Sequence, residues 1–287
     1  MSRQNVDTII ETSLTKILSA EEYSKARHDN PYIFKLTTPK AELFYFGAYH
    51  CRKPDDPIFK EIEKSFNDFK PDAVFVEGLV GLAENRDWFM KRYGNMRPEE
   101  AIDLAGESGF TTLLAFKNDI FCDSPEPDDK EIFEHLLSKG YSKDEVFLHE
   151  FIKILPQYHR QMNRYGFKEY VSVFLDRMEK KVKWPVFDFS YERGLSLARK
   201  LWGEDFDPET DTSSKDKIDP IPWKDKRARQ TIINEISRTE GIFRDQIITK
   251  KILESLQHYS KVFVVYGASH AYMEEPAFQY FAKEAGK

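Results

Sequence analysis

Apolar residues along the first half of the chain follow two different spacings. Residues 6–20 and 57–71 carry apolar side chains every three or four positions, which predicts amphipathic helices, and Pro71 ends the second of them. The apolar run at 72–78 predicts a short buried strand, and 119–127 predicts a strand that leads into a loop with prolines. This part of the sequence therefore alternates between helix and strand.

The segment 31–50 contains two apolar runs on either side of the polar stretch TPKAE, which predicts a β-hairpin. Residues 98–117 have a helical pattern with a break near two glycines, and a long helix over 223–258 leads into an apolar strand at 262–266. Strands that alternate with helices predict an α/β fold. We expect a mixed, mostly parallel sheet that starts with the hairpin and is flanked by helices.

The pattern changes between residues 128 and 182, where helical segments rich in aromatic residues follow one another without a strand. We interpret 128–182 as a helical insertion within a single α/β domain that spans residues 1–287. The apolar run at 184–190 predicts a return to a strand. The polar, proline-containing stretch 204–222 predicts a mobile loop.

Composition and charge narrow the class of protein. The chain is 40% hydrophobic and 32% charged, and its net charge of −6 comes from well-mixed basic and acidic residues. No basic stripe favours nucleic acid as a partner. The start lacks the apolar core of a signal peptide, and no apolar run approaches the roughly 18 residues of a membrane helix. We expect a cytoplasmic protein without membrane insertion, in which Cys51 and Cys122 are free thiols.

Two predicted strands end in the same motif, a glycine followed three positions later by a histidine. LFYFGAYH contains Gly47 and His50, and VFVVYGASH contains Gly267 and His270. Random order of the 13 glycines and 7 histidines would give about 0.3 such matches. We expect the glycines to allow a sharp turn and a close backbone approach to whatever the histidines bind. A third strand ends in Glu77.

Ligands bind beyond the carboxyl ends of the strands in an open parallel sheet. Two imidazoles and a carboxylate that meet at this edge would form a three-ligand site for a divalent metal, with an open position for water. The alternative is that each histidine caps a strand end in a satisfied hydrogen bond. The spacing alone does not distinguish these two interpretations.

The order of GAYH, VFVEG and GASH resembles that of the TraB/Tiki superfamily. This group includes pheromone-shutdown proteins, Tiki metalloproteases and, more distantly, erythromycin esterases and ChaN-like haem-binding proteins. GESGFTTLLAFKNDIFCD (106–123) and FRDQIITKKI (243–252) resemble two further stretches of the family. The chain departs from the family after Asp123, where an Asp-Arg pair is replaced by Asp-Ser-Pro-Glu. The polar residue that completes the site at this corner is left open.

The resemblance implies a metal-dependent hydrolase, a metallopeptidase that cleaves a peptide or ester bond with metal-activated water. His50, Glu77 and His270 would be the metal ligands, with Glu77 as third ligand or general base. The resemblance favours Mn²⁺ or Co²⁺, and two nitrogens and an oxygen would also accept Zn²⁺ or Fe²⁺. It implies Glu107 and Arg244 as further site residues. The alternative interpretations are that Glu107 is an acid at the start of a helix and that Arg244 forms a solvent-exposed ion pair with Asp245.

Two other functions stay open. One is a metal-free, erythromycin-esterase-like hydrolase with His50 as the base, and the other is a non-catalytic protein that binds haem or a peptide. No P-loop, G-x-G-x-x-G or G-x-S-x-G motif occurs, which disfavours nucleotide binding and serine-hydrolase chemistry. His149 and His159 lack the spacing of a zinc pair. The substrate, a peptide or a small molecule, and the oligomeric state, with a homodimer as one alternative, are left open.

Overall fold

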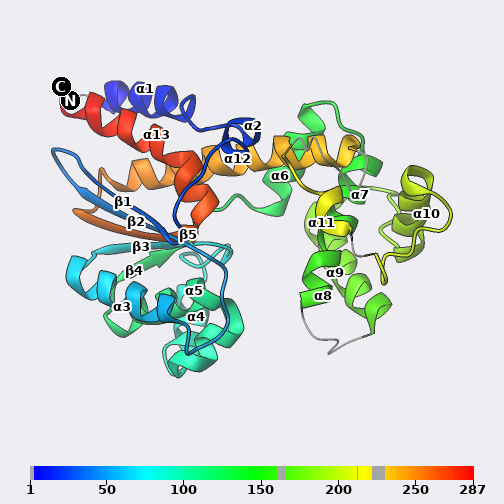
Figure 1. The fold of residues 1–287 in the computed structure, drawn as a ribbon, viewed down its shortest axis with the longest axis horizontal. Helices are drawn as coiled ribbons and strands as arrows, with labels where there is room; N and C mark the ends of the chain where they lie inside the picture. The colour runs from blue at the N-terminus through cyan, green and yellow to red at the C-terminus, as the bar shows by residue number, and fades with distance from the viewer. Residues whose placement is uncertain (1–2, 161–165, 212, 222–229) are drawn as a thin grey trace. The chain divides into compact units, whose positions relative to one another are not determined.

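In the computed structural model, a five-stranded sheet forms the centre of the first of two units (Figure 1). The first unit contains Met1–Pro127 and Arg244–Lys287, and the second contains Asp128–Phe243. Each unit has hydrophobic core residues of its own. The structure describes residues 3–160, 166–211, 213–221 and 230–287.

The strand order across the sheet is β1-β2-β5-β3-β4. β1 and β2 pair antiparallel as a hairpin, and the other neighbours, β2 with β5, β5 with β3 and β3 with β4, are parallel. This topology confirms the predicted α/β fold with a mixed, mostly parallel sheet. The strands are β1 (Tyr32–Thr37), β2 (Glu42–Ala48), β3 (Ala73–Val76), β4 (Phe121–Asp123) and β5 (Lys261–Gly267).

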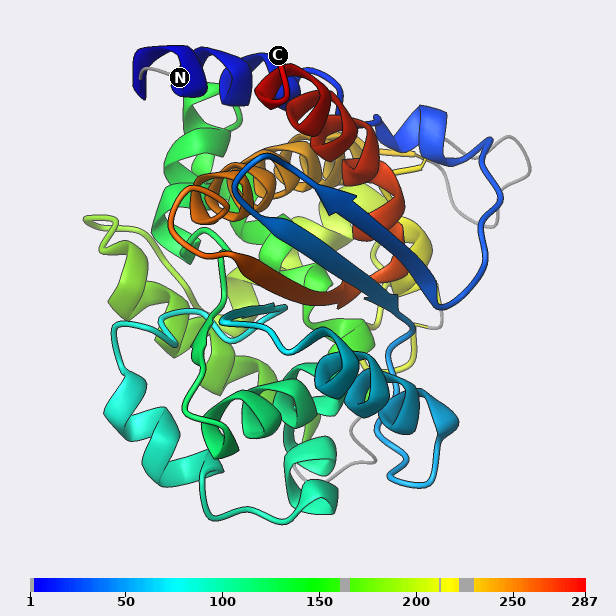
Figure 2. The same cartoon turned by 90° about the vertical axis from the view of Figure 1, so that its left-hand side faces the viewer.

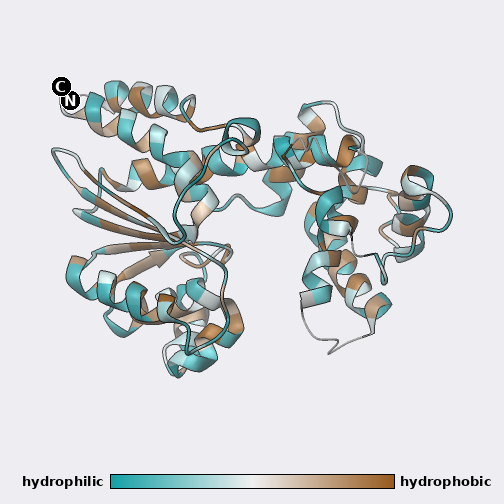
Figure 3. Cartoon of the chain, in the orientation of Figure 1, coloured by the Kyte–Doolittle hydropathy of each residue, from teal (hydrophilic) through white to brown (hydrophobic). Residues whose placement is uncertain are grey.

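Helices cover both faces of the sheet (Figure 2). Phe46 and Val265 pack into the core that includes α3 and α5, whereas Tyr45 and Val264 pack into the core beside α1, α12 and α13. Successive side chains of a strand point to opposite faces, so apolar runs such as LFYF are buried on both sides. Figure 3 shows hydrophobic residues along these strands. The helices are α1 (Arg3–Leu14), α2 (Ala20–Tyr23), α3 (Pro57–Phe69), α4 (Arg86–Tyr93), α5 (Pro98–Lys117), α12 (Ile232–Ser255) and α13 (Ala268–Ala285).

The predicted helix over 57–71 is α3, and its ends follow local chemistry. The Asp56 carboxylate accepts a hydrogen bond of 3.0 Å from the backbone N–H of Ile58, which caps the first turn. Lys70 ends the helix in the left-handed conformation, with φ of 54°, directly before Pro71. The helix expected over 6–20 is α1, which ends at Leu14, and the separate short helix α2 begins only at Ala20. The final helix, α13, was not predicted from the sequence.

The regular elements of the second unit are all helices within its described residues, and those of the stretch 128–182 are among them. Its core is aromatic and aliphatic, with Phe147, Phe151 and Leu136 fully buried. Residues Ile232–Phe243 of α12 also belong to this unit, while the rest of α12 belongs to the first. The other helices are α6 (Asp129–Ser138), α7 (Lys143–Lys153), α8 (Leu155–Arg160), α9 (Phe167–Val182), α10 (Tyr191–Trp202) and α11 (Ser214–Lys217).

The predicted strand at 184–190 is wrong. This segment is an irregular loop in which Trp184, Phe187 and Phe189 pack against one another, with ring centroids 4.9–5.7 Å apart. Val186 is fully exposed and has a φ of 57°. The alternation of large and exposed residues resembles a strand, but the described part of this unit has no other strand with which it could pair.

Two predicted segments lie partly outside the described residues. The stretch 204–222 contains α11, where the buried Lys217 ammonium lies 3.0 Å from both carboxylate oxygens of Asp211; residues 212 and 222 lie outside the described residues. The helix expected over 223–258 is described from Ile232 to Ser255, and 223–229 lie outside the described residues. Among the helices of the described ranges, none has the length and apolar character needed to cross a membrane.

Candidate metal centre

The register of three parallel strands brings the predicted ligands to one edge of the sheet. Ala48 at the end of β2 lies beside Gly267 at the end of β5, and Val76 at the end of β3 lies beside Val265. His50, Glu77 and His270 therefore leave the sheet at the same edge. Each is one to three residues beyond the strand that delivers it.

Gly267 marks the point around which the three side chains gather. Its backbone N–H donates a hydrogen bond of 2.8 Å to Oε2 of Glu77. A Cβ at this position would lie 3.4 Å from Oε2 of Glu77, 3.5 Å from Cδ2 of His270 and 3.8 Å from Cε1 of His50. The structure thus brings the three sequence-predicted residues together, and their role as metal ligands stays a prediction.

The sharp turn and the close approach to a ligand that we expect of Gly47 and Gly267 are not found at both positions. Gly267 has a φ of −58°, which any residue adopts, and it precedes the first turn of α13. At Gly47 a Cβ would lie 2.6 Å from the backbone oxygen of Tyr32 and 2.7 Å from Cβ of Ala271. The first glycine therefore permits the close packing of α13 on β2 rather than an approach to a ligand.

His270 lies in the first turn of α13 and is held by a buried acid. Its Nδ1 lies 2.7 Å from Oδ1 of Asp245, which α12 supplies and which is 2% exposed. Its Nε2 lies 3.9 Å from Oε1 of Glu77. Burial lowers the pKa of His270, but the nearby charges of Asp245 and Glu77 outweigh it and raise the pKa to about 10.

His50 is held in the same way, although its own side chain is exposed. Its Nδ1 lies 2.6 Å from Oε1 of Glu107, and the backbone N–H of Cys51 donates to the other oxygen of that carboxylate at 3.3 Å. Glu107 is buried, and its hydrogen bond raises the pKa of His50. In both histidines, Nδ1 thus lies against a carboxylate, and Nε2 is the ring nitrogen that could bind a metal ion.

A break in α5 places Glu107 beside His50. Ala105 and Gly106 leave the helical conformation, and Gly106 has a φ of +57°. A Cβ at Gly106 would lie 2.7 Å from the carbonyl oxygen of Cys51. Glycine is therefore required at this break for both its φ and its contact with the segment that carries His50. Glu107 contacts the His50 ring and the backbone of Cys51, and its alternative interpretation as an acid at a helix start does not account for these contacts.

Glu77 is ionised by its surroundings. Burial raises the pKa of this carboxyl, but His270, His50 and Arg244 together outweigh burial and lower the pKa below its usual value. Arg244 itself forms a two-pronged pair with Glu126, with nitrogen–oxygen distances of 2.8–3.0 Å. Arg244 is thus held by Glu126, and the solvated pair with Asp245 is not what the structure shows. Near this corner, after Asp123, Glu126 is thus the acid that binds Arg244.

Two acids of this region were not assigned to the site from the sequence, Asp245 and Glu274. Glu274 is 0% exposed and accepts a hydrogen bond of 2.8 Å from Tyr45. Its other oxygen has no hydrogen-bond partner among the described residues and lies 4.0 Å from Nδ1 of His270. Burial and the charge of Asp245 raise the pKa of Glu274 well above its usual value. The spacing of four between His270 and Glu274 after the last strand was the available signal.

Ligand atoms of Asp245, His270 and Glu274 lie within 4.8 Å of one another, so this group could also hold a metal ion. It would use Nδ1 of His270, whereas the set predicted from the sequence would use Nε2. Asp123 is not part of either set. Its carboxylate accepts a hydrogen bond of 3.1 Å from the backbone N–H of Ala83, and burial raises its pKa.

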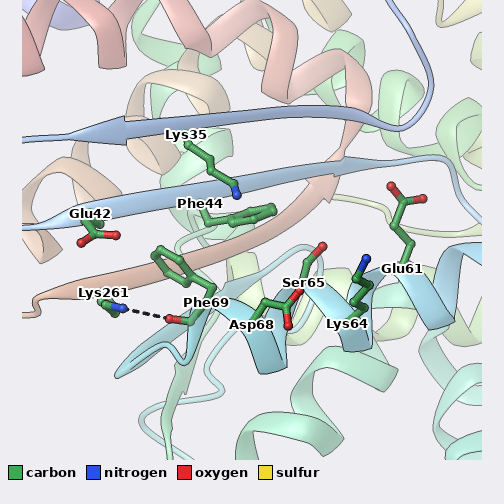
Figure 4. A pocket seen from close by; sticks show the side chains of 9 residues that line it. All are labelled: Lys35, Glu42, Phe44, Glu61, Lys64, Ser65, Asp68, Phe69 and Lys261. Carbon is green, nitrogen blue, oxygen red and sulfur yellow. Dashed lines mark hydrogen bonds between the residues drawn. The ribbon is translucent and has the colours of Figure 1, made fainter.

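A groove in the first unit lies at the opposite end of the sheet (Figure 4). Its volume is about 340 Å³, and it is lined by Glu42 and Lys261, the first residues of β2 and β5, and by the second half of α3. The Lys35 ammonium lies 4.5 Å from the ring centroid of Phe44. Since the histidines follow the last residues of these strands, the groove is not part of the candidate centre.

Comparisons with protein-family models, with curated proteins and with solved structures found no match to this chain. The likeness to the TraB/Tiki superfamily therefore stays a prediction from the motifs. What the structure adds is the geometry of the buried carboxylate and histidine groups, which could hold a metal ion.

Proposed function

We propose that this protein is a metal-dependent, TraB/Tiki-like hydrolase that cleaves a peptide or ester bond. The observation that supports the proposal is the repeated pairing of histidine with a buried carboxylate. Asp245 bonds Nδ1 of His270 and Glu107 bonds Nδ1 of His50, at 2.7 and 2.6 Å. Histidines that bind a metal through one ring nitrogen donate the N–H of the other to a carboxylate in this way, which fixes the orientation and the tautomer of the ring.

The donor set fits a divalent transition metal, because it offers two imidazole nitrogens and one ionised carboxylate. His50 and His270 would hold the ion through Nε2, and Glu77 would supply the oxygen. A divalent ion in such a site supplies Lewis-acid activation of water and of a carbonyl group.

Glu77 is suited to two roles. The backbone N–H of Gly267 fixes Oε2 and leaves Oε1 facing His270. An ionised carboxylate held in this way can be the third ligand, or it can accept a proton from the attacking water as general base. Arg244 adds positive charge near Glu77 while its guanidinium remains bound to Glu126.

The first test is the metal content of the wild type and of His50→Ala, Glu77→Gln and His270→Ala. His50→Ala and His270→Ala should each remove one equivalent of bound Mn, Co, Zn or Fe, because each removes a ligand of the same ion. Glu77→Gln should do the same where Glu77 is the third ligand, and should keep the metal but lose activity where Glu77 is the general base. His258→Ala, an exposed histidine in the turn before β5, is the matched control and should retain the metal. A wild type that takes up no metal even after back-loading would overturn the proposal.

A metal-free esterase is the second candidate, and one observation favours it. His50 is exposed while its Nδ1 is held by the buried Glu107, which is the arrangement of an oriented general base. This candidate predicts hydrolysis of an activated ester in the presence of chelator, and loss of that activity in His50→Ala. Activity that disappears with chelator and returns with Mn²⁺ or Co²⁺ would exclude it.

A further inference from the structure

A second group of charged side chains is buried in the helical unit. It consists of His149 and Glu150 on α7 and Glu240 on α12, which are 2%, 6% and 3% exposed. Their ligand atoms lie within 4.8 Å of one another. α7 and the first part of α12 belong to the same unit (Figure 1). This group shares no residue with the centre at the edge of the sheet.

His149 directs one ring nitrogen at two acids. Its Nδ1 lies 3.1 Å from Oε1 of Glu150 and 3.5 Å from Oε2 of Glu240. Its Nε2 lies 3.0 Å from the hydroxyl of Ser237, and that hydroxyl donates its only proton to the carbonyl oxygen of Ile233 at 3.1 Å. The hydroxyl must therefore accept a hydrogen bond from Nε2, so Nε2 carries a proton.

With the proton on Nε2, a neutral His149 has a lone pair on Nδ1 that faces carboxylate oxygens. Acceptors facing each other in a buried site require a positive charge between them, either a second proton on the ring or a cation. Oε2 of Glu240 is buried and makes no hydrogen bond to any residue that the structure describes, and it lies on this side of the ring. A cation there would contact Nδ1 and both carboxylates.

Lys153 supplies part of the positive charge in this structure. Its ammonium lies 2.5 Å from Oε1 of Glu240 and 3.3 Å from Oε1 of Glu150, and its side chain is 31% exposed. It bridges the two carboxylates from the side that reaches solvent. A lysine side chain on a flexible stem can withdraw its ammonium into water, whereas the three ligands are fixed in the core.

We propose that His149, Glu150 and Glu240 form a second metal site, which takes a divalent transition metal in exchange for the ammonium of Lys153. One imidazole nitrogen and two carboxylates suit Mn²⁺, Fe²⁺, Co²⁺ or Zn²⁺. Two carboxylates and a neutral imidazole neutralise a divalent ion, so the displaced lysine is not needed for charge balance. The inference does not depend on the function proposed for the centre at the sheet edge.

The test is a titration of the full-length, metal-stripped protein with Co²⁺, followed by visible absorption and by the number of bound equivalents. It is made in the His270→Ala background, which removes a ligand shared by both candidate sets at the sheet edge. We expect His270→Ala to bind one equivalent and His270→Ala/Glu240→Gln to bind none. Glu235→Gln, an exposed acid on the same helix, is the matched control and should bind as the background does.

Lys153→Met sharpens the test, because it removes the competing ammonium and leaves the three ligands. Binding should become tighter by about tenfold, which corresponds to ~1.4 kcal/mol. Equal Co²⁺ binding with and without Glu240→Gln, in variants whose circular dichroism shows a folded chain, would overturn the inference. If Glu240→Gln does not fold, an unchanged affinity in Lys153→Met overturns it.

The outcomes separate the two metal proposals. Loss of Co²⁺ in Glu240→Gln but not in His270→Ala would support the helical site and contradict the centre at the sheet edge. Loss only in His270→Ala would do the reverse. A wild type that binds no Co²⁺ would overturn both.

Discussion

The two G-x-x-H segments have the same spacing but different structures. Gly47 to His50 leaves β2 as a loop, and its exposed histidine is held by an acid at a break in α5. Gly267 to His270 starts α13, and its largely buried histidine is held by an acid on α12. A shared motif therefore fixes where each histidine leaves the sheet, while the surrounding helices decide how each ring is held.

The glycines should show the largest difference in stability. Gly47→Ala places a methyl group 2.6 Å from the carbonyl oxygen of Tyr32, so we expect a loss of about 1–3 kcal/mol from overpacking. Gly267→Ala meets neighbours only at 3.4 Å or more and should cost less than about 1 kcal/mol. Urea denaturation followed by circular dichroism measures both, and equal losses would contradict the packing argument.

The acids behind the two rings should matter next. Asp245→Asn and Glu107→Gln should each weaken binding at this centre by about 10–100-fold, because each removes the bond that orients a ligand. The effect should be larger for Asp245, since its histidine is the more buried of the two. Titration with Mn²⁺ measures the affinity, with the exposed Glu254→Gln on α12 as control. Unchanged affinity in both variants would remove the support for the proposed function.

The pH dependence of the metal-free protein distinguishes the two rings further. The pKa of His270 is raised from 6.5 to about 10 by Asp245 and Glu77, against the effect of burial. A group with a raised pKa stabilises the folded state fully below its unfolded value and loses this contribution as the pH rises. We expect the urea midpoint, measured in the presence of chelator, to decrease as the pH rises from 6.5 to about 10. Asp245→Asn should make this decrease smaller. A flat profile in the wild type would contradict it.

The smallest effect is expected at Glu274. Burial and the charge of Asp245 raise the pKa of this carboxyl well above its usual value, which favours the neutral form that glutamine resembles. Glu274→Gln should change the free energy of unfolding by less than about 0.5 kcal/mol and should leave the metal content unchanged. Loss of metal in this variant would instead assign the ion to Asp245, His270 and Glu274.

Apolar spacing was sufficient to predict the sheet and the edge at which the candidate ligands meet. Runs such as LFYF and VFVV are buried on both faces, and such runs predict parallel strands without any partner being known. The segment at 184–190 has a similar composition but no neighbouring strand in the described unit. An apolar run forms a strand only where another strand lies beside it. The residues of the run alone do not show whether such a neighbour exists.

The candidate centre was predicted only in part. His50, Glu77 and His270 each follow directly from a strand end, so their positions could be inferred from the strands. Asp245 and Glu274 lie on helices, and their approach to His270 depends on how α12 and α13 pack on the sheet. The His149 group was missed because its three ligands are 91 positions apart at most in sequence and share no metal-binding spacing.

The salt bridge between Glu126 and Arg244 lies at the two ends of the chain segment that forms the second unit. Glu126 is two residues before the chain enters the second unit, and Arg244 is the first residue after the chain leaves it. This salt bridge therefore joins the points at which the chain leaves the sheet unit and returns to it. A segment whose two ends are adjacent can be gained, lost or exchanged in evolution with a short connector in its place, and the order of the strands would not change.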